Sequence, residues 1–366
     1  MSNVEVVAPT VDVAAEEGPP RRVRGALRRV DMSGPLRLLA ALLGALGLFA
    51  ILMLIKGANP LTAYGDMFRS TFTDRNQIAG IVIKATPIIL AALAVSVPAR
   101  GGLINVGGEG QLVIGGVGAM GVSLLLGGHV AGPLNLVFMG LAAALAGGLW
   151  SALAAVLRRA VGIAESVTTL LMNYIALDLM YFLIYDRWKD RNGSGQPATR
   201  PVRAGEHLPL LGNTRIHLGI ALAVLATLII FAIMGTTSWG FKLRVVGGNP
   251  EAARRAGLDV TRILITAMFV GGALAGLGGF CQLAGAEFKL RSGFLFGYGY
   301  IGFLGSWLAR HRPIGVALAC LLLAGISIGG DSLQLDSHLP AASVNVLMAL
   351  VLLGVFGFGK KKVAAT

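Results

Sequence analysis

The residues that could do chemistry in this chain are polar side chains set inside long apolar stretches. In the run 101–111, Asn105, Glu109 and Gln111 stand among five glycines. Non-helical backbone at membrane depth is tolerated where it lines a cavity or is buried in protein. A carboxylate inside a membrane marks a functional site by default. The run therefore predicts either the lining of a solute passage or an interfacial turn in which Glu109 faces water.

A second polar group follows in the run 165–174. Glu165, Thr169 and Asn173 are four residues apart, so a helix places them on one face. That polar stripe predicts contact with other helices or with a water-filled path. Thr168 and Thr169 have an alternative, because threonine hydroxyls also bond the carbonyls of their own helix. Asp178 lies deeper in the same apolar run and needs a partner.

Two matches to nucleotide-binding motifs lack the required context. Residues 297–302 read G-x-G-x-x-G, but no strand–helix unit or acidic ribose ligand accompanies them. Residues 354–360 resemble the start of a phosphate loop, yet Lys361 stands where Ser or Thr must bind magnesium. The histidines are scattered and the two cysteines lie far apart, so no metal site is predicted. These patterns predict neither an enzyme nor a cofactor site.

Composition indicates the elements that must position these groups. The 366 residues are 55% hydrophobic and only 13% charged, against roughly 25% charged in soluble domains. This predicts an all-α polytopic membrane protein of about ten transmembrane helices. One or two of these helices are short or re-entrant. The expected spans are 36–55, 78–98, 103–126, 134–157, 167–185, 216–234, 263–284, 294–309, 314–328 and 344–358.

The distribution of positive charge predicts the topology. The net charge is +13, but the basic residues flank apolar segments and form no single stripe, which argues against nucleic-acid binding. Ten spans put both termini on the basic side, which is cytoplasmic by the positive-inside rule. We expect a disordered basic tail over 1–33, a permease domain over 34–359 and a tail over 360–366. The loop 238–262 is then cytoplasmic, and the loop 186–215 is extracytoplasmic.

A short helix is predicted inside the cytoplasmic loop. Asn249 is a good N-cap, Pro250 fits the first helical position, and Gly257 fits the position just after the helix. Glu251 sits near the positive end of the helix dipole and Arg254 toward the negative end. Helices below roughly 12–15 residues are marginal alone, so this helix needs neighbours or a partner to hold it.

A faint internal repeat accompanies these segments. Residues from 78 onward and from 263 onward each give an apolar span, a polar break and a glycine-rich segment. Transporters are often built from two such halves. The repeat predicts two related structural halves in this chain.

Taken together, the motifs resemble a known family. Residues 103–111, Leu-Ile-Asn-Val-Gly-Gly-Glu-Gly-Gln, resemble the N-I-G-x-E-G-Q motif of ABC-importer permeases for simple sugars, nucleosides and branched-chain amino acids. Residues 165–174 are similar to a stretch of the nucleoside branch, and 247–257 look like that family's G-x-N-P-x-A-A-x-x-A-G loop. Residues 299–302 and 329–334 also match, in the right order. The resemblance covers about 75–358. Gly108 departs from it, because the family usually has alanine there, and Trp307 adds bulk.

This resemblance implies roles for the residues above. The short helix would be a coupling helix that docks on a separate ATP-binding subunit, so ATP and magnesium would bind that partner and this chain would be no enzyme. The other partners would be a second, related permease in a heterodimer, an extracytoplasmic substrate-binding protein and the lipid bilayer of the bacterial inner membrane. The pathway residues would be Asn105, Glu109, Gln111, Glu165, Thr168, Thr169 and Asn173. The coupling residues would be Gly248, Asn249, Pro250, Glu251, Ala252, Ala253, Arg254 and Gly257.

The resemblance implies uptake of nucleosides by alternating access, and two alternatives stay open. The first is a simple-sugar permease of the same family. The second is an ion-coupled secondary carrier using Lys84, Glu165 or Asp178. A carrier needs an intramembrane ionisable pair and no ATPase.

Overall fold

The computed structural model describes residues 33–193, 195–336 and 342–359, and this part of the chain is helical with no strand. Two tails were predicted, over 1–33 and 360–366. Except for Ser33, both lie outside the described residues. The helices are α1 (Ser33–Ile55), α2 (Pro60–Thr73), α3 (Arg75–Ala99), α4 (Gly108–Leu126), α5 (Gly132–Val161), α6 (Glu165–Phe182), η1 (Leu183–Arg187), η2 (Ala204–Glu206), α7 (Gly219–Thr236), α8 (Ser238–Gly248), α9 (Pro250–Arg255), α10 (Val260–Gln282), η3 (Leu283–Glu287), α11 (Tyr298–Leu308), α12 (Pro313–Asp336) and α13 (Ala342–Gly359).

Within the described ranges, seven helices are long and apolar enough to cross a membrane, so the expected count of about ten is not reached. They are α3, α4, α5, α6 with η1, α7, α10 with η3, and the first part of α12. The predicted span 36–55 coincides with α1, but it passes this test only together with α2, which bends away by 117°. Most of the segment 56–77, between the first two expected spans, forms α2. Helix α11 has only 11 residues because the chain before it, 288–297, is non-helical.

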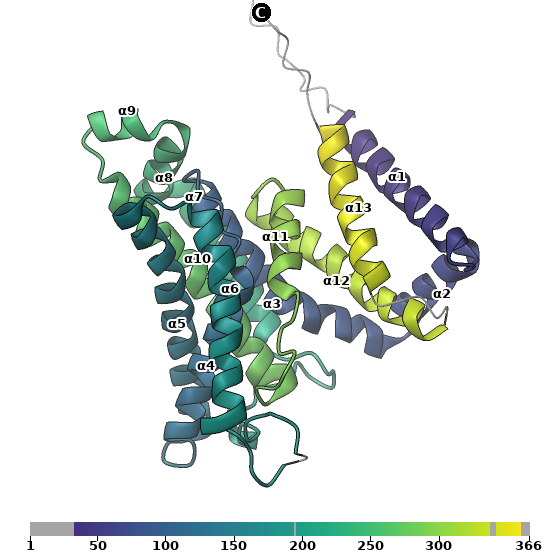
Figure 1. Ribbon diagram of the computed structural model, residues 1–366, viewed down its shortest axis with the longest axis horizontal. Helices are drawn as coiled ribbons and strands as arrows, with labels where there is room; N and C mark the ends of the chain where they lie inside the picture. Colours follow the sequence, from purple (N-terminus) through teal and green to yellow (C-terminus); the bar gives the residue numbers. More distant parts are fainter. Residues whose placement is uncertain (1–32, 194, 337–341, 360–366) are drawn as a thin grey trace, which may run out of the picture.

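Helix α3 is the centre of the bundle. Every residue of α3 from Ala85 to Pro98 is buried, and α10, α11, α12 and α7 surround this helix. Small residues let the neighbouring helices approach closely, as is common in membranes. A methyl group at Gly276 of α10 would overlap the carbonyl oxygen of Ala143 in α5. Helices α1 and α13 lie side by side at the edge of the bundle, where Phe49, Met53 and Leu347 form a separate apolar cluster (Figure 1).

The two ends of the bundle differ. Helix α9 lies at one end, and the connection between α6 and α7 lies at the other (Figure 1). That connection contains the predicted extracytoplasmic loop 186–215. Buried Glu206 ties it to the bundle, because Ser123 of α4 and Asn135 of α5 both donate to its carboxylate. The described ends of α1 and α13 lie on the same side as α9 (Figure 1).

Two pairs of helices, α3 with α4 and α10 with α11, run in opposite directions around the core. Helix α3 ends beside α8, and residues 100–107 then lead back to α4. Helix α10 starts on the α9 side and ends beside the loop between α6 and α7, where Leu208 donates to the carbonyl of Ala284. Residues 288–297 then lead back to α11. The two units that the faint sequence repeat links therefore run in opposite directions, and their relation as repeats stays a prediction.

Candidate functional site

The polar stripe on α6 holds a non-helical segment of backbone at its side. The amide of Ile104 donates to the Glu165 carboxylate at 2.9 Å, and the amide of Val106 donates to the Thr169 hydroxyl at 3.1 Å. The amide of Gly110 donates to the Asn173 side-chain oxygen at 2.8 Å. The stripe thereby supplies acceptors for amides of the non-helical segment and of the first turn of α4. None of these amides has an acceptor within a helix, and backbone inside a membrane requires one.

The spacing of the stripe explains how it serves this segment. Four helical residues from Glu165 to Thr169 rise about 6 Å. Two residues of non-helical backbone, from Ile104 to Val106, span a similar distance of about 6.6 Å when extended. The step from Glu165 to Thr169 therefore matches these two residues, and the step from Thr169 to Asn173 spans Val106 to Gly110 in the first turn of α4. The Asn173 amide group also donates to the carbonyl of Val106 at 3.1 Å, so both its oxygen and its nitrogen bond to backbone.

Asn105 and Gln111 form a buried amide pair at the start of α4. Each side chain donates to the other, at 3.1 and 2.9 Å, and Asn105 also donates to the carbonyl of Ala94 in α3. The amide of Gly107 donates to the Asn105 oxygen at 3.0 Å. This pair joins the non-helical segment to both α3 and α4, and its atoms are fully paired, as buried polar groups generally are.

Glu109 joins the first turns of two helices. The amide of Gly297, the N-cap of α11, donates to one carboxylate oxygen at 2.6 Å, and that of Gly299 donates to the other at 2.7 Å. First-turn amides have no intrahelical acceptor, and the helix N-terminus favours negative charge. Glu109 also sits in the first turn of its own helix, α4. The carboxylate, 1% exposed, is therefore held where the N-terminal ends of α4 and α11 meet.

The remaining predicted pathway residues are also accounted for. Glu165 forms an ion pair with Arg158 at the end of α5. The Thr168 hydroxyl donates to the carbonyl of Ala164 in its own helix at 3.2 Å. Thr169 likewise donates to the carbonyl of Glu165 at 2.7 Å. The structure thus brings all seven predicted pathway residues to one region and buries each of them. Contact with a substrate remains a prediction for each of the seven.

A cavity of about 310 Å³ lies next to this network, between α3, α11, α12 and α13. Its aromatic residues are Phe296, Tyr298 and Tyr300, and the ammonium nitrogen of Lys84 lies 5.9 Å from the centroid of the Tyr298 ring. Asn173 reaches the Tyr300 hydroxyl at 3.4 Å, which connects the cavity to the α6 stripe. Ser327 and Asn345 complete the polar lining. The size falls in the range of small-molecule sites.

This cavity was not among the predicted site residues. Four helices from distant parts of the chain contribute to it, so no local pattern contains it. The one sequence signal was the alternation of aromatic residues and glycine over 297–302, which could line a solute path.

The short helix of the polar loop is present as α9. The Asn249 side chain accepts from the amides of Glu251 and Ala252, both at 3.0 Å, and Gly257 follows the helix with φ of +80°. Glu251 pairs with Arg254 at 3.1 Å. Among residues 249–257 only Ala253 is buried, so the helix presents nearly all of its surface.

Helix α8 connects this short helix to the non-helical segment. Gly247 of α8 lies so close to the end of α3 that a methyl group there would overlap the carbonyl oxygen of Arg100. A methyl at Gly102 would lie 3.7 Å from Gly247. The chain therefore has continuous contact from α9 through α8 to residues 100–102, directly before the segment that the α6 stripe holds.

Comparisons with known proteins show the family of this chain. The sequence matches the family described as branched-chain amino acid transport system, permease component, over residues 77–356. The glucose ABC transporter permease protein TsgB13 of Haloferax volcanii is 33% identical over 323 residues, which cover 85% of this chain and 84% of the relative. The guanosine permease protein NupP of Bacillus subtilis is 33% identical over 327 residues, covering 87% and 91%. The nucleoside permease protein NupB of Lactococcus lactis subsp. cremoris is 30% identical over 325 residues, covering 86% and 88%.

Proposed function

The chain belongs to the family of permease components of branched-chain amino acid transport systems, and we propose that it is the transmembrane subunit of an ATP-driven importer for nucleosides. The observation that carries this proposal is the continuous contact from exposed α9 to the network around Asn105, Glu109 and Asn173. A membrane subunit driven from outside the bilayer needs such a connection between a docking element and its passage.

Helix α9 is the docking element in this proposal. Its six residues are too few to be stable alone, and its neighbours bury only Ala253. An ATP-binding subunit would cover the exposed face, and ATP and magnesium would bind there, so this chain would hydrolyse nothing itself. The loop 238–262 would then be cytoplasmic, and both termini would lie on the same side of the bacterial inner membrane.

Movement of α9 would reach the passage through α8. A shift of α8 moves its close contact with Arg100 and Gly102, and the segment that follows is anchored on α6 by hydrogen bonds. The same segment leads to Glu109, which holds α4 and α11 together. Two arrangements of this set of contacts would give an inward-open and an outward-open state, as alternating access requires.

The passage would run along α6 and the aromatic cavity, facing a second permease subunit. Asp178 is exposed in the middle of α6, and a charge facing lipid at that depth is costly. A water-filled passage between two permeases would hydrate this carboxylate. Tyr300 is exposed on the same passage and borders the aromatic cavity. An extracytoplasmic binding protein would deliver the substrate at the opposite end from α9, near the loop 186–215.

The aromatic lining favours a nucleoside. Phe296, Tyr298 and Tyr300 offer ring faces, and ring faces stack on nucleobases irrespective of base identity. Ser327 and Asn345 offer hydrogen bonds for ribose. A sugar permease is the second candidate, because the glucose permease TsgB13 is as similar to this chain as the guanosine permease NupP. The ion-coupled carrier is less well supported, because Glu165 is already paired with Arg158 at a helix end and Asp178 is exposed.

Uptake of labelled substrates tests the proposal. Cells that lack nucleoside uptake would express the chain with its neighbouring transport genes, and accumulation of labelled guanosine and glucose would be compared. The proposal expects ATP-dependent accumulation of the nucleoside. Accumulation of glucose alone would replace the substrate, and uptake that follows an ion gradient without ATP would contradict the importer.

A further inference from the structure

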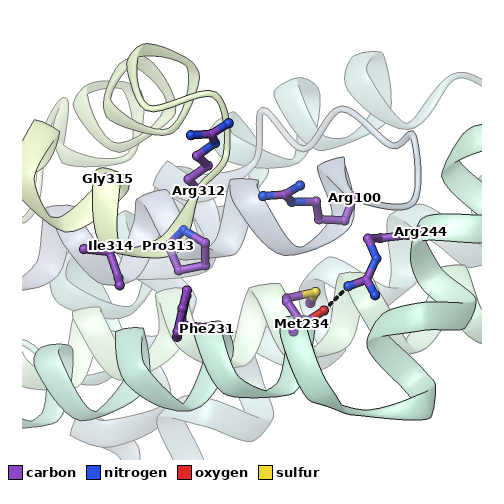
Figure 2. A pocket seen from close by; sticks show the side chains of 9 residues that line it. Arg100, Phe231, Met234, Arg244, Arg312, Pro313, Ile314 and Gly315 are labelled. Atoms are coloured by element: carbon purple, nitrogen blue, oxygen red, sulfur yellow. Dashed lines mark hydrogen bonds between the residues drawn. The ribbon is translucent and has the colours of Figure 1, made fainter. Parts of the chain in front are cut away.

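Three arginines converge on one cavity at the end of the bundle that carries α9. Arg100 follows α3, Arg244 lies on α8, and Arg312 precedes α12. The cavity has a volume of about 530 Å³, and Figure 2 shows the three side chains around it. We call it the arginine pocket. Its other lining residues are Phe231, Met234, Gly235, Pro313, Ile314 and Gly315.

The pocket holds concentrated positive charge without a described counter-ion. In the part of the chain that the structure describes, no carboxylate lines it and no ion pair involves these three arginines. Burial and the charges of Arg244 and Arg312 lower the pKa of Arg100 from its usual value. Arg100 donates to the carbonyl of His311 at 3.0 Å, while its Nε is buried without an acceptor. The geometry thus leaves donors and charge for an anion.

The start of α12 adds further donors. Proline occupies its first position, and the amide of Val316 donates to the carbonyl of Arg312, the residue just before the helix. The amides of Ile314 and Gly315 therefore lie in a first turn whose N–H groups have no helical acceptor. The dipole of this 24-residue helix also favours an anion at that end.

The apolar walls of the pocket indicate where the anion comes from. Phe231 of α7 and Ile314 of α12 are both exposed, at 52% and 47%, and they lie beside the arginines (Figure 2). Both belong to ends of helices that are long and apolar enough to span the membrane. Such exposed apolar walls beside arginines suit the level where lipid headgroups meet acyl chains.

We propose that the arginine pocket binds the phosphate of an anionic phospholipid headgroup in the leaflet on the α9 side. Arginine forks match phosphate oxygens in a bidentate manner, and Phe231, Pro313 and Ile314 contact the glycerol and upper acyl chains. The bound headgroup ties α8 to the ends of α3 and α12. Lipid composition then affects how firmly the α8–α9 unit is held to the bundle.

Lipid binding to the purified full-length chain tests this site. The double variant Arg244→Gln/Arg312→Gln removes two exposed arginines, and it also removes the hydrogen bond that Arg244 donates to the carbonyl of Met234 in α7. The matched control, Arg159→Gln/Lys242→Gln, removes two exposed positive charges that do not line the pocket. Native mass spectrometry would titrate phosphatidylglycerol, phosphatidylcholine and inorganic phosphate against each protein, and thermal unfolding would verify the fold.

The proposal expects preferential binding of phosphatidylglycerol over phosphatidylcholine. The double variant should weaken that binding by roughly tenfold, because charge-assisted bonds to phosphate are lost, and the control should change it less than about twofold by the same reasoning. Equal weakening in both variants would indicate non-specific attraction and overturn the site. Binding of inorganic phosphate as tightly as of phosphatidylglycerol would overturn the lipid as the source of the anion.

Discussion

An alanine at Gly299 is expected to separate the first turns of α4 and α11. Its methyl group would overlap the amide of Glu109 and lie 2.6 Å from the carbonyl carbon of Gly108. The helices would have to move apart by about 1.4 Å to restore a nonbonded separation of roughly 3.5 Å between the methyl carbon and the Glu109 nitrogen. That shift also pulls two backbone amides away from the Glu109 carboxylate.

The expected loss of stability is large. Overpacking costs about 1–3 kcal/mol, and each lost hydrogen bond to a charged group costs about 1.5–3 kcal/mol. The combined loss of about 4–9 kcal/mol is comparable with the roughly 5–15 kcal/mol that stabilises a folded domain. Gly299→Ala should therefore lower the unfolding temperature strongly and abolish transport.

Gly108→Ala is the matched control at the same crossing. Its methyl would lie 3.5 Å from the Gly299 carbonyl oxygen, an ordinary contact. Tryptophan fluorescence of the detergent-solubilised protein would report unfolding, and substrate uptake would report function. The control should behave like the natural chain. A Gly299→Ala protein with unchanged unfolding temperature and uptake would refute the argued contact between α4 and α11.

Three further substitutions test other parts of the account. Glu251→Lys removes both ion pairs of α9 and places a positive charge near its N-terminus, so less ATPase should co-purify while membrane insertion persists; unchanged co-purification would count against α9 as the coupling helix. Asn173→Leu leaves the amide of Gly110 and the carbonyl of residue 106 unpaired, which should destabilise the protein by about 2–6 kcal/mol, and an unaltered unfolding temperature would contradict this. Gly247→Ala pushes α8 away from the end of α3, so ATP hydrolysis should continue while substrate uptake falls. A normal amount of substrate taken up per ATP would exclude this contact as the connection between α9 and the passage.

Local patterns predicted the parts of this structure that depend on near neighbours. The periodicity of Glu165, Thr169 and Asn173 gave one face of α6, as observed. Asn249 and Gly257 predicted the two ends of a short helix, because capping depends only on residues next to the helix. The apolar runs gave the positions of most helices. Each of these depends on residues within about two helical turns.

The partners of these patterns could not be predicted locally. The α6 stripe faces α4 and α11, in line with one of the two expected alternatives, but its partners include backbone amides 61 to 63 residues earlier, which no local pattern indicates. Likewise, Lys84 and Asn345 meet at one cavity only through the packing of α3 and α13. Hydropathy predicted about ten spans, with one or two of them short or re-entrant; α11, with 11 residues, is a short one, and seven helices of the described residues are long and apolar enough to span.

The ATPase activity of the reconstituted complex, with its binding protein, should be measured against nucleosides and monosaccharides. We expect nucleosides to stimulate hydrolysis and Glu251→Lys to abolish this stimulation. Stimulation by monosaccharides alone would keep the mechanism and replace the substrate. The absence of any co-purifying ATPase, with uptake independent of ATP, would contradict the account.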